Sequence, residues 1–235
     1  MTRLRALDPA RHGALRLDRA RGAAGRRLVP VGRGEIAPLV ADMPLLFAKD
    51  AQTGRFEPVA LLGLVEPVNL FVSPAGYHAT SQPGAAGLTA LRLDAGGVDG
   101  LAVDEADPSL GTTGEPLFVD GRAGHWRAAL DAALSDVTAG RALADGYAQR
   151  GLLRRLSVVL SMDDGQEQVL DGLYGVVEEA LAALPDADVV AMHRADELAP
   201  AAVLTASLAQ VERLRQLHNA RFPQQIAAIR LAIGD

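Results

Sequence analysis

The sequence has no cysteine, and it has only one lysine and one tryptophan in 235 residues. The absence of cysteine excludes disulfides, cysteine-held metal and iron–sulfur sites, and cysteine nucleophiles. Lysine chemistry is confined to Lys49, which no glycine-rich phosphate-binding loop surrounds. The dinucleotide-binding pattern G-x-G-x-x-G after a strand and the hydrolase pattern G-x-S-x-G are also missing. We therefore expect no catalytic residue and no cofactor.

Histidines are few and lie far apart along the chain. They are His12, His78, His125, His193 and His218. No two of them have the H-x-H or H-x-x-x-H spacing that places two imidazoles on one metal ion, so we expect no metal site. The alternative is an uncharacterised enzyme whose site is assembled from residues distant in sequence, with His78, Asp104, Glu105 and His125 as candidates.

Long apolar runs are also absent. No stretch of about 18 apolar residues occurs, so we expect no transmembrane segment. The first residues carry charges where a secretory signal needs an uninterrupted apolar segment. The expected location is the cytoplasm, with export to the cell surface by a signal-free route as the alternative.

The charge of the chain is unevenly distributed. Residues 1–33 contain nine arginines and two aspartates, a net charge of +7, whereas the whole chain carries −6. We expect a solvated basic segment that lies against the acidic remainder. The alternative is an arm that binds nucleic acid or anionic membrane electrostatically. No aromatic residue lies between these arginines to stack on bases, so nucleic acid is not the expected partner.

The pattern of apolar residues predicts an α+β fold. Residues 34–121 contain short apolar runs separated by glycine and proline, which indicates a β-rich half with short strands. The expected strands lie at 44–48, 58–65, 68–72, 101–105 and 116–120, with a hairpin turn at Thr53-Gly54. We predict one domain over 34–235, preceded by the basic segment 1–33.

Residues 122–235 form the helix-rich half. Apolar residues spaced by three or four predict an amphipathic helix over 124–150 with a break near 138–143. Asp164-Gly165 lies between two apolar runs and predicts the one β-hairpin of this half. The segment 197–218 is expected to be the longest helix of the chain.

The order of these segments resembles the SapC family, bacterial proteins of similar length that take their name from a surface-layer locus. The opening of the family is matched by Val29-Pro30-Val31, Glu35-Ile36 and the segment Met43 to Phe47. In order along the chain, the resemblance is carried by residues 26–47, 61–77, 115–124, 151–186 and 192–214. It implies a single α+β domain.

The stretch "HRADE", His193 to Glu197, looks most like a chemical site, because a histidine and a glutamate four residues apart share one face of a helix. The resemblance implies a different arrangement, in which a short helix ends here and a long helix containing Ser207-Leu208 follows. On that mapping Asp196 caps the second helix and Glu197 adds a favourable charge to its first turn. We therefore favour capping over metal or acid/base chemistry.

One segment departs from the family pattern. Residues 76–93 lack the family's cluster of arginines and aromatic residues, and Tyr77 stands where the family has tryptophan. Asn69, Phe71 and Tyr77 are the candidate binding residues, as the remainder of that surface, although aromatic and β-branched residues in strand runs favour a place in the strand core.

The resemblance implies a non-catalytic accessory protein that binds a protein partner or a small ligand through its β-rich half. It also implies a link to the cell surface or to outer-membrane transport. Fold and family do not specify a mechanism.

Overall fold

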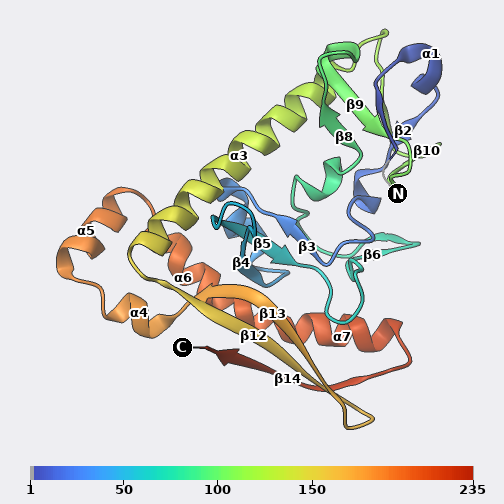
Figure 1. Cartoon of the computed structure of the whole chain (residues 1–235). Helices are drawn as coiled ribbons and strands as arrows, with labels where there is room; N and C mark the ends of the chain where they lie inside the picture. The colour runs from blue at the N-terminus through green and yellow to red at the C-terminus, as the bar shows by residue number, and fades with distance from the viewer. Residues whose placement is uncertain (1–2, 235) are drawn as a thin grey trace.

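The computed structural model describes residues 3–234 and confirms the α+β class (Figure 1). Its helices are α1 Pro9–His12, α2 Ile36–Leu39, α3 Gly124–Gln149, α4 Glu178–Ala182, α5 Asp186–Arg194, α6 Leu198–Ser207 and α7 Val211–Arg221. Its strands are β1 Leu4–Ala6, β2 Arg16–Leu17, β3 Leu28–Pro30, β4 Leu45–Lys49, β5 Phe56–Leu61, β6 Val72–Ser73, β7 Gly76–Tyr77, β8 Leu91–Leu93, β9 Leu101–Asp104, β10 Leu110–Gly111, β11 Glu115–Pro116, β12 Leu153–Met162, β13 Glu167–Val176 and β14 Ile226–Ile233. None of the described helices combines the length and apolar character needed to span a bilayer.

A six-stranded antiparallel sheet in the order β14-β12-β13-β4-β5-β3 forms the main body of the molecule. Both predicted hairpins are confirmed within it, β4–β5 around Thr53-Gly54 and β12–β13 around Asp164-Gly165. Gly54 and Gly165 have φ angles of 70° and 83°, a conformation that glycine adopts at little cost. Helices α6 and α7 pack on this sheet and bury the large core.

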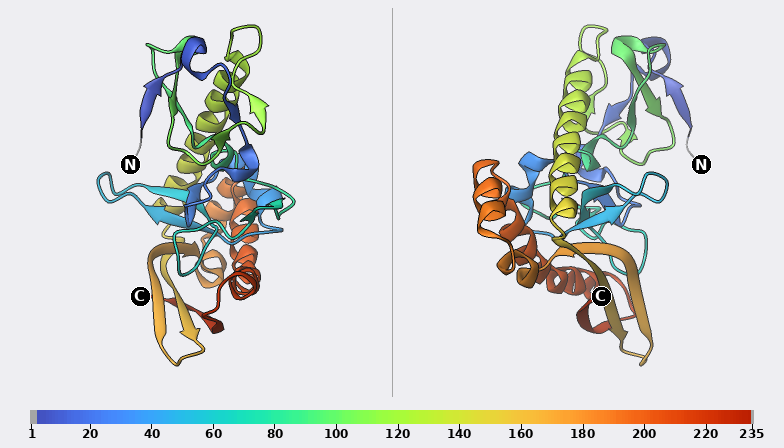
Figure 2. Two further views of the ribbon diagram at one scale, coloured as in Figure 1. Left: turned by 90° about the vertical axis from the view of Figure 1, so that its right-hand side faces the viewer. Right: turned by 60° about the vertical axis from the view of Figure 1, so that its left-hand side comes forward.

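A smaller unit, called the small lobe here, is built on the three-stranded sheet β1-β9-β8. Its own hydrophobic core is separate from that of the main body. The core residues are Leu7, Leu17, Leu88, Ala90, Leu91, Leu101, Val103, Leu117, Ala123, Trp126 and Leu130. Figure 2 shows this lobe at one end of the molecule and the main sheet toward the other.

Residues 3–33 are built into both parts, so they are not a solvated segment. Strand β1 pairs with β9, and β3 is an edge strand of the main sheet. Leu7 and Leu17 are buried in the core of the small lobe. The predicted division of the chain at residue 33 stays a prediction. Residues before and after it pair in the same sheets and pack in the same hydrophobic cores.

Helix α3 runs from the small lobe to the main body as one continuous helix of 26 residues. The break predicted near 138–143 is wrong, and α3 rather than 197–218 is the longest helix. The hydroxyl of Thr138 donates to the Leu134 carbonyl at 2.8 Å, which satisfies this polar group inside the helix. A side chain at Gly140 would meet the Val31 carbonyl oxygen at 2.8 Å, so glycine lets the helix approach the backbone just after β3 closely.

The region 197–218 is two helices, α6 and α7, joined by a short 3₁₀ turn. β13 pairs with β4 only at Phe47 and Ala48, so the backbone of Leu45 has no partner strand on that side. The buried Ser207, at the junction of α6 and α7, supplies the hydrogen-bond partner. The Leu45 N–H donates to Ser207 Oγ at 3.0 Å, and this hydroxyl donates to the Leu204 carbonyl at 2.7 Å. The Ser207-Leu208 pair therefore has a structural role.

Several predicted strands differ from the structure. Most of 68–72 and of 116–120 is loop, whereas β9 confirms the strand expected at 101–105. Strand β14 was not expected, although it completes the main sheet beside β12. The short apolar run of β14 follows Phe222-Pro223 and lacks the turn signals by which the other strands are recognised.

The stretch His193 to Glu197 is a helix end of the Schellman type. The Glu197 N–H donates to the Met192 carbonyl at 2.8 Å, and the Asp196 N–H donates to the His193 carbonyl at 3.2 Å. Asp196 has a φ of 55°, the left-handed conformation that usually belongs to glycine at this position. The expectation that Asp196 caps α6 is wrong, because Glu197 occupies the cap position and neither side chain accepts a capping bond.

Two side chains from elsewhere fix this turn. Arg33 donates from Nη2 to the carbonyls of Ala195 and Asp196 at 2.7 and 3.2 Å, and the Tyr147 hydroxyl donates to the Glu197 carbonyl at 2.6 Å. His193 lies on α5, and Glu197 is the N-terminal cap residue of α6. The two therefore do not share one helix face, which confirms the arrangement implied by the family resemblance. The stretch is a structural turn.

The Asp196→Gly variant tests this assignment, because the two roles of Asp196 predict changes of opposite sign in the free energy of unfolding. We expect Asp196→Gly to raise the free energy of unfolding by up to about 1 kcal/mol, because glycine adopts the left-handed conformation without a Cβ clash. A side chain that capped α6 would instead make the same change destabilising by a few tenths. The measurement is urea unfolding followed by circular dichroism. Ala195→Gly is the control, expected to lower stability because Ala195 has a φ of −91°, which alanine adopts without strain.

Candidate functional site

The three predicted binding residues lie together. The Phe71 N–H donates to Asn69 Oδ1 at 3.0 Å, and the rings of Phe71 and Tyr77 have centroids 6.1 Å apart. Asn69 and Phe71 are fully buried, and Tyr77 is half-buried. The three side chains pack together, and Asn69 Nδ2 and the Tyr77 hydroxyl are buried without a hydrogen-bond partner among the described residues. A role in binding stays a prediction.

A partly buried ion pair, formed by the buried Asp42 and the half-buried Arg213, lies beside these residues. Asp42 accepts from Arg213 and from the Thr80 N–H, the latter at 2.7 Å, and the Arg213 guanidinium lies 5.6 Å from the Phe71 ring centre. Burial opposes the charge of Asp42, but these hydrogen bonds and Arg213 lower its pKa below the ordinary value. Burial, together with the Asp42 charge, raises the pKa of Tyr77, so this phenol keeps its proton at physiological pH.

The four candidate residues of the enzyme alternative have separate surroundings. His78 Nε2 lies 2.5 Å from Ser73 Oγ, and His125 packs beside the Trp126 ring. Asp104 Oδ1 accepts from the Arg3 N–H at 2.7 Å. Within residues 3–234 no three histidine or carboxylate side chains are grouped to hold a metal ion. No hydrogen bond or ion pair joins His78 or His125 to Asp104 or Glu105 in that range.

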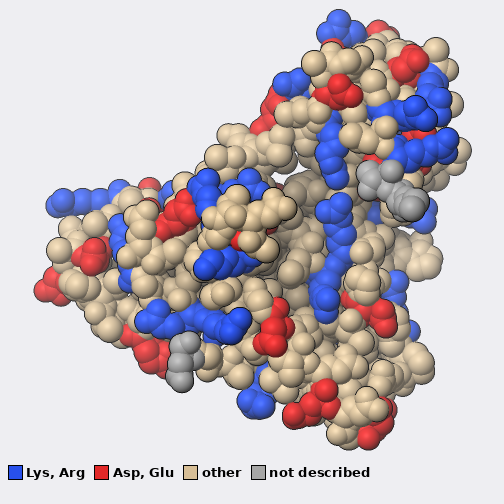
Figure 3. Space-filling view, viewed as in Figure 1, with Lys and Arg blue, Asp and Glu red and all other residues tan. Residues whose placement is uncertain are grey.

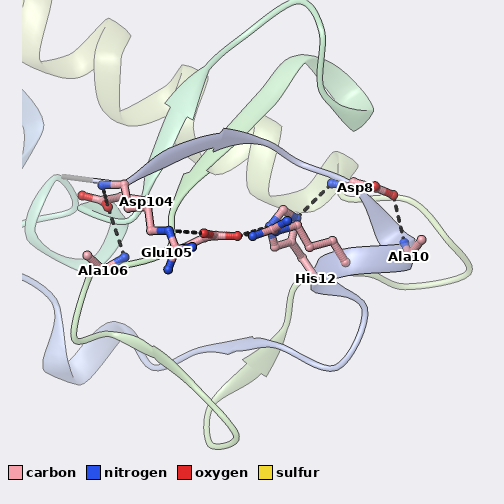
Figure 4. A network of polar contacts seen from close by, with 8 residues as sticks. Asp8, Ala10, His12, Asp104, Glu105 and Ala106 are labelled. Carbon is pink, nitrogen blue, oxygen red and sulfur yellow. Dashed lines mark hydrogen bonds and ion pairs between the residues drawn. The ribbon is translucent and has the colours of Figure 1, made fainter.

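Glu105 is the centre of a polar network that fastens the N-terminal strand (Figure 4). Its Oε1 accepts from Arg11 Nε at 2.5 Å and lies 3.2 Å from Nε2 of the buried His12, and its Oε2 lies 3.1 Å from Arg3 Nε. The Asp8 N–H donates to His12 Nδ1 at 3.1 Å, which places the imidazole proton on Nε2, toward Glu105. The network joins Arg3, before β1, and Arg11 and His12, in α1, to Glu105, which follows β9, so it has a structural role.

A partly apolar groove runs along the middle of α3. It has a volume of about 420 Å³ and lies between α3, β8 and β3, where the small lobe meets the main body. Its apolar lining residues are Val29, Pro30, Ala85, Leu88, Leu91, Leu93, Leu130, Ala133, Leu134 and Val137. Leu93 and Leu134 remain 49% and 44% exposed, which is high for leucine next to a core.

The charges that line this groove are all positive. Arg26, Arg92 and Arg141 are its ionisable side chains, and its two hydroxyl residues are Thr89 and Thr138. The space-filling view shows the surface hollowed between the small lobe and the main body, with basic side chains gathered on both sides (Figure 3). An apolar floor with a few convergent polar groups at a junction of two units is the usual form of a ligand site.

The sequence contained part of this site. The amphipathic helix predicted over 124–150 contains the apolar residues Leu130, Leu134 and Val137. The segment 76–93, which supplies the opposite side of the groove, departs from the family pattern. No sequence signal indicated that these two segments lie across from each other, because the pairing depends on where the small lobe packs against α3.

The pKa of Glu105 gives the N-terminal network a defined pH dependence. The hydrogen bond from Arg11 is the largest contribution that lowers this pKa to about 2, below the ordinary value for glutamate. Because the folded pKa is depressed, the stabilisation is present above about pH 5 and is lost as the pH falls toward 2. We expect Glu105→Gln to lower the urea midpoint at pH 7, and the difference from wild type to shrink by pH 3. Glu167→Gln is the control, since Glu167 is exposed and makes no side-chain bond within the described residues. An equal loss at both pH values would contradict the role given to the charge.

Comparison with known proteins identifies the family. The SapC family model matches residues 7–214, which span both parts of the molecule and the whole of α3. No curated protein and no solved structure matches the chain. Since the match covers most of the 235 residues, the chain belongs to the SapC family.

Proposed function

We propose that this chain is an accessory binding protein without a catalytic site of its own, and that it binds through the groove along α3. The observation that carries the proposal is the apolar floor of the groove, with Leu93 and Leu134 left exposed beside it. Binding is favourable when a ligand removes an exposed apolar surface in a concave site from water.

The chemistry of the lining favours binding over catalysis. The groove lining contains no histidine, aspartate or glutamate, the side chains that most often act as general acids and bases. Thr89 Oγ1 accepts from the Ala23 N–H at 3.3 Å, and the Thr138 hydroxyl donates to a carbonyl of its own helix. Neither hydroxyl has a neighbouring base to activate it as a nucleophile within the groove lining.

The wider role follows from the family resemblance rather than from the site. We propose action in the cytoplasm, with a protein partner as the alternative occupant of the groove and a link to the cell surface through that partner. The predicted residues Asn69, Phe71 and Tyr77 belong to this proposal only as a second contact, supported by the partial exposure of Tyr77.

The test uses the neutral apolar dye N-phenyl-1-naphthylamine, whose fluorescence rises in an apolar site. We expect the full chain to bind one equivalent of dye. Leu134→Asp should weaken binding by about tenfold, because it places a charge and its bound water on the groove wall. Leu134 is already partly exposed, so the variant should keep its fold, and circular dichroism checks this.

Val190→Asp is the matched control, since Val190 is 47% exposed on α5 outside the groove. Unchanged dye binding by Leu134→Asp, or an equal loss with Val190→Asp, would contradict the proposal.

A further inference from the structure

We infer that the groove takes a small amphiphilic anion, with a hydrocarbon body and one carboxylate or phosphate head. This inference rests on the proposed function and specifies the chemical class of its ligand. It follows from the balance of charge around the groove, from the placement of two arginines and from the size of the apolar floor.

Only one of the three arginines at the groove has an ion-pair partner among the described residues. Arg141 is paired, because its Nη2 and Nε donate to Glu57 Oε2 at 2.7 and 3.0 Å. Arg26 and Arg92 have no carboxylate within ion-pair distance among residues 3–234. Two unpaired guanidinium groups beside an apolar floor favour a ligand that carries negative charge.

Arg92 is held in place at the groove. Its Nη1 donates to the carbonyls of Thr89 and Leu91 at 2.8 and 2.7 Å. A guanidinium has five N–H donors in a planar fork, so the remaining donors are available to a carboxylate or phosphate. Because its own backbone positions the group, less rotamer freedom is lost when it binds an anion.

The floor of the groove suits a hydrocarbon chain. Leu88, Leu91, Leu130 and Val137 are buried in its floor, and Leu93 and Leu134 form exposed walls. A volume of about 420 Å³ lies in the range of small-molecule sites. A cation is disfavoured, since every ionisable side chain that lines the groove is an arginine.

The test is isothermal titration calorimetry of the full chain with four ligands that share a C12 hydrocarbon chain, each kept below its critical micelle concentration or solubility limit. They are dodecanoate, dodecyl phosphate, dodecanol and dodecyltrimethylammonium. We expect at least one of the two anions to bind about tenfold tighter than the alcohol, and the cation to bind weakest, because hydrogen bonds to charged groups contribute more than neutral ones. Tighter binding of the carboxylate points to a free fatty acid, and tighter binding of the phosphate points to a lipid headgroup.

The double variant Arg26→Gln/Arg92→Gln separates charge from apolar contact. We expect its affinity for the preferred anion to fall to that of the alcohol, with alcohol binding unchanged. Arg194→Gln is the control, because Arg194 is exposed on α5 and lies outside the groove.

Each contrary outcome has its own meaning. Equal affinity of wild type for the alcohol and for both anions would overturn the inference and leave the proposed function standing. Binding of none of the four ligands, together with no binding of the neutral dye, would overturn both. An equal loss of anion affinity in Arg194→Gln and in the double variant would also overturn the inference.

Discussion

The packing of α3 against two separate hydrophobic cores is the constraint on which the rest of the structure depends. Trp126 and Leu130, in its first half, belong to the core of the small lobe, and Leu143 and Tyr147, in its second half, belong to the core of the main body. A helix of 26 residues is about 39 Å long, which is enough to connect two cores without a hinge. The position of each part is therefore set by one rigid element.

The groove is a consequence of this arrangement. The middle of α3 leaves one core before it enters the other, so Leu134 is covered by neither. β8 and the loop before it face the helix from the small lobe, and β3 faces it from the main body. A ligand in the groove contacts both parts and stabilises their relative position, in proportion to its concentration and affinity.

Local signals in the sequence predicted the parts of the fold that depend on local chemistry. Both hairpins of the main sheet were expected from Thr53-Gly54 and Asp164-Gly165, and both were confirmed. The prediction of a break in α3 is wrong. The Thr138 hydroxyl bonds within the helix, and Gly140 fits closely against the backbone just after β3, so both residues are compatible with a continuous helix. The small lobe was not predicted, since its sheet joins β1 to β9 across about a hundred residues of chain.

The candidate site was less predictable than the fold for the same reason. Histidine and carboxylate residues attract attention in a sequence, yet Glu105 fastens a strand here and the "HRADE" stretch is a helix end. The groove is made of leucines and arginines, which are common residues and carry no motif. Only the crossing of α3 over β3 and β8 brings them to one place.

Amide hydrogen exchange of the full chain, measured by mass spectrometry without ligand and with dodecanoate or dodecyl phosphate, tests the role of the groove most directly. The account predicts slower exchange in peptides that cover residues 85–93 and 130–141, on the two sides of the groove. Peptides from α4 and α5 should be unchanged, since these helices lie outside it. Protection confined to α4 and α5, or no protection at saturating concentrations of either anion, would contradict a binding role of the groove.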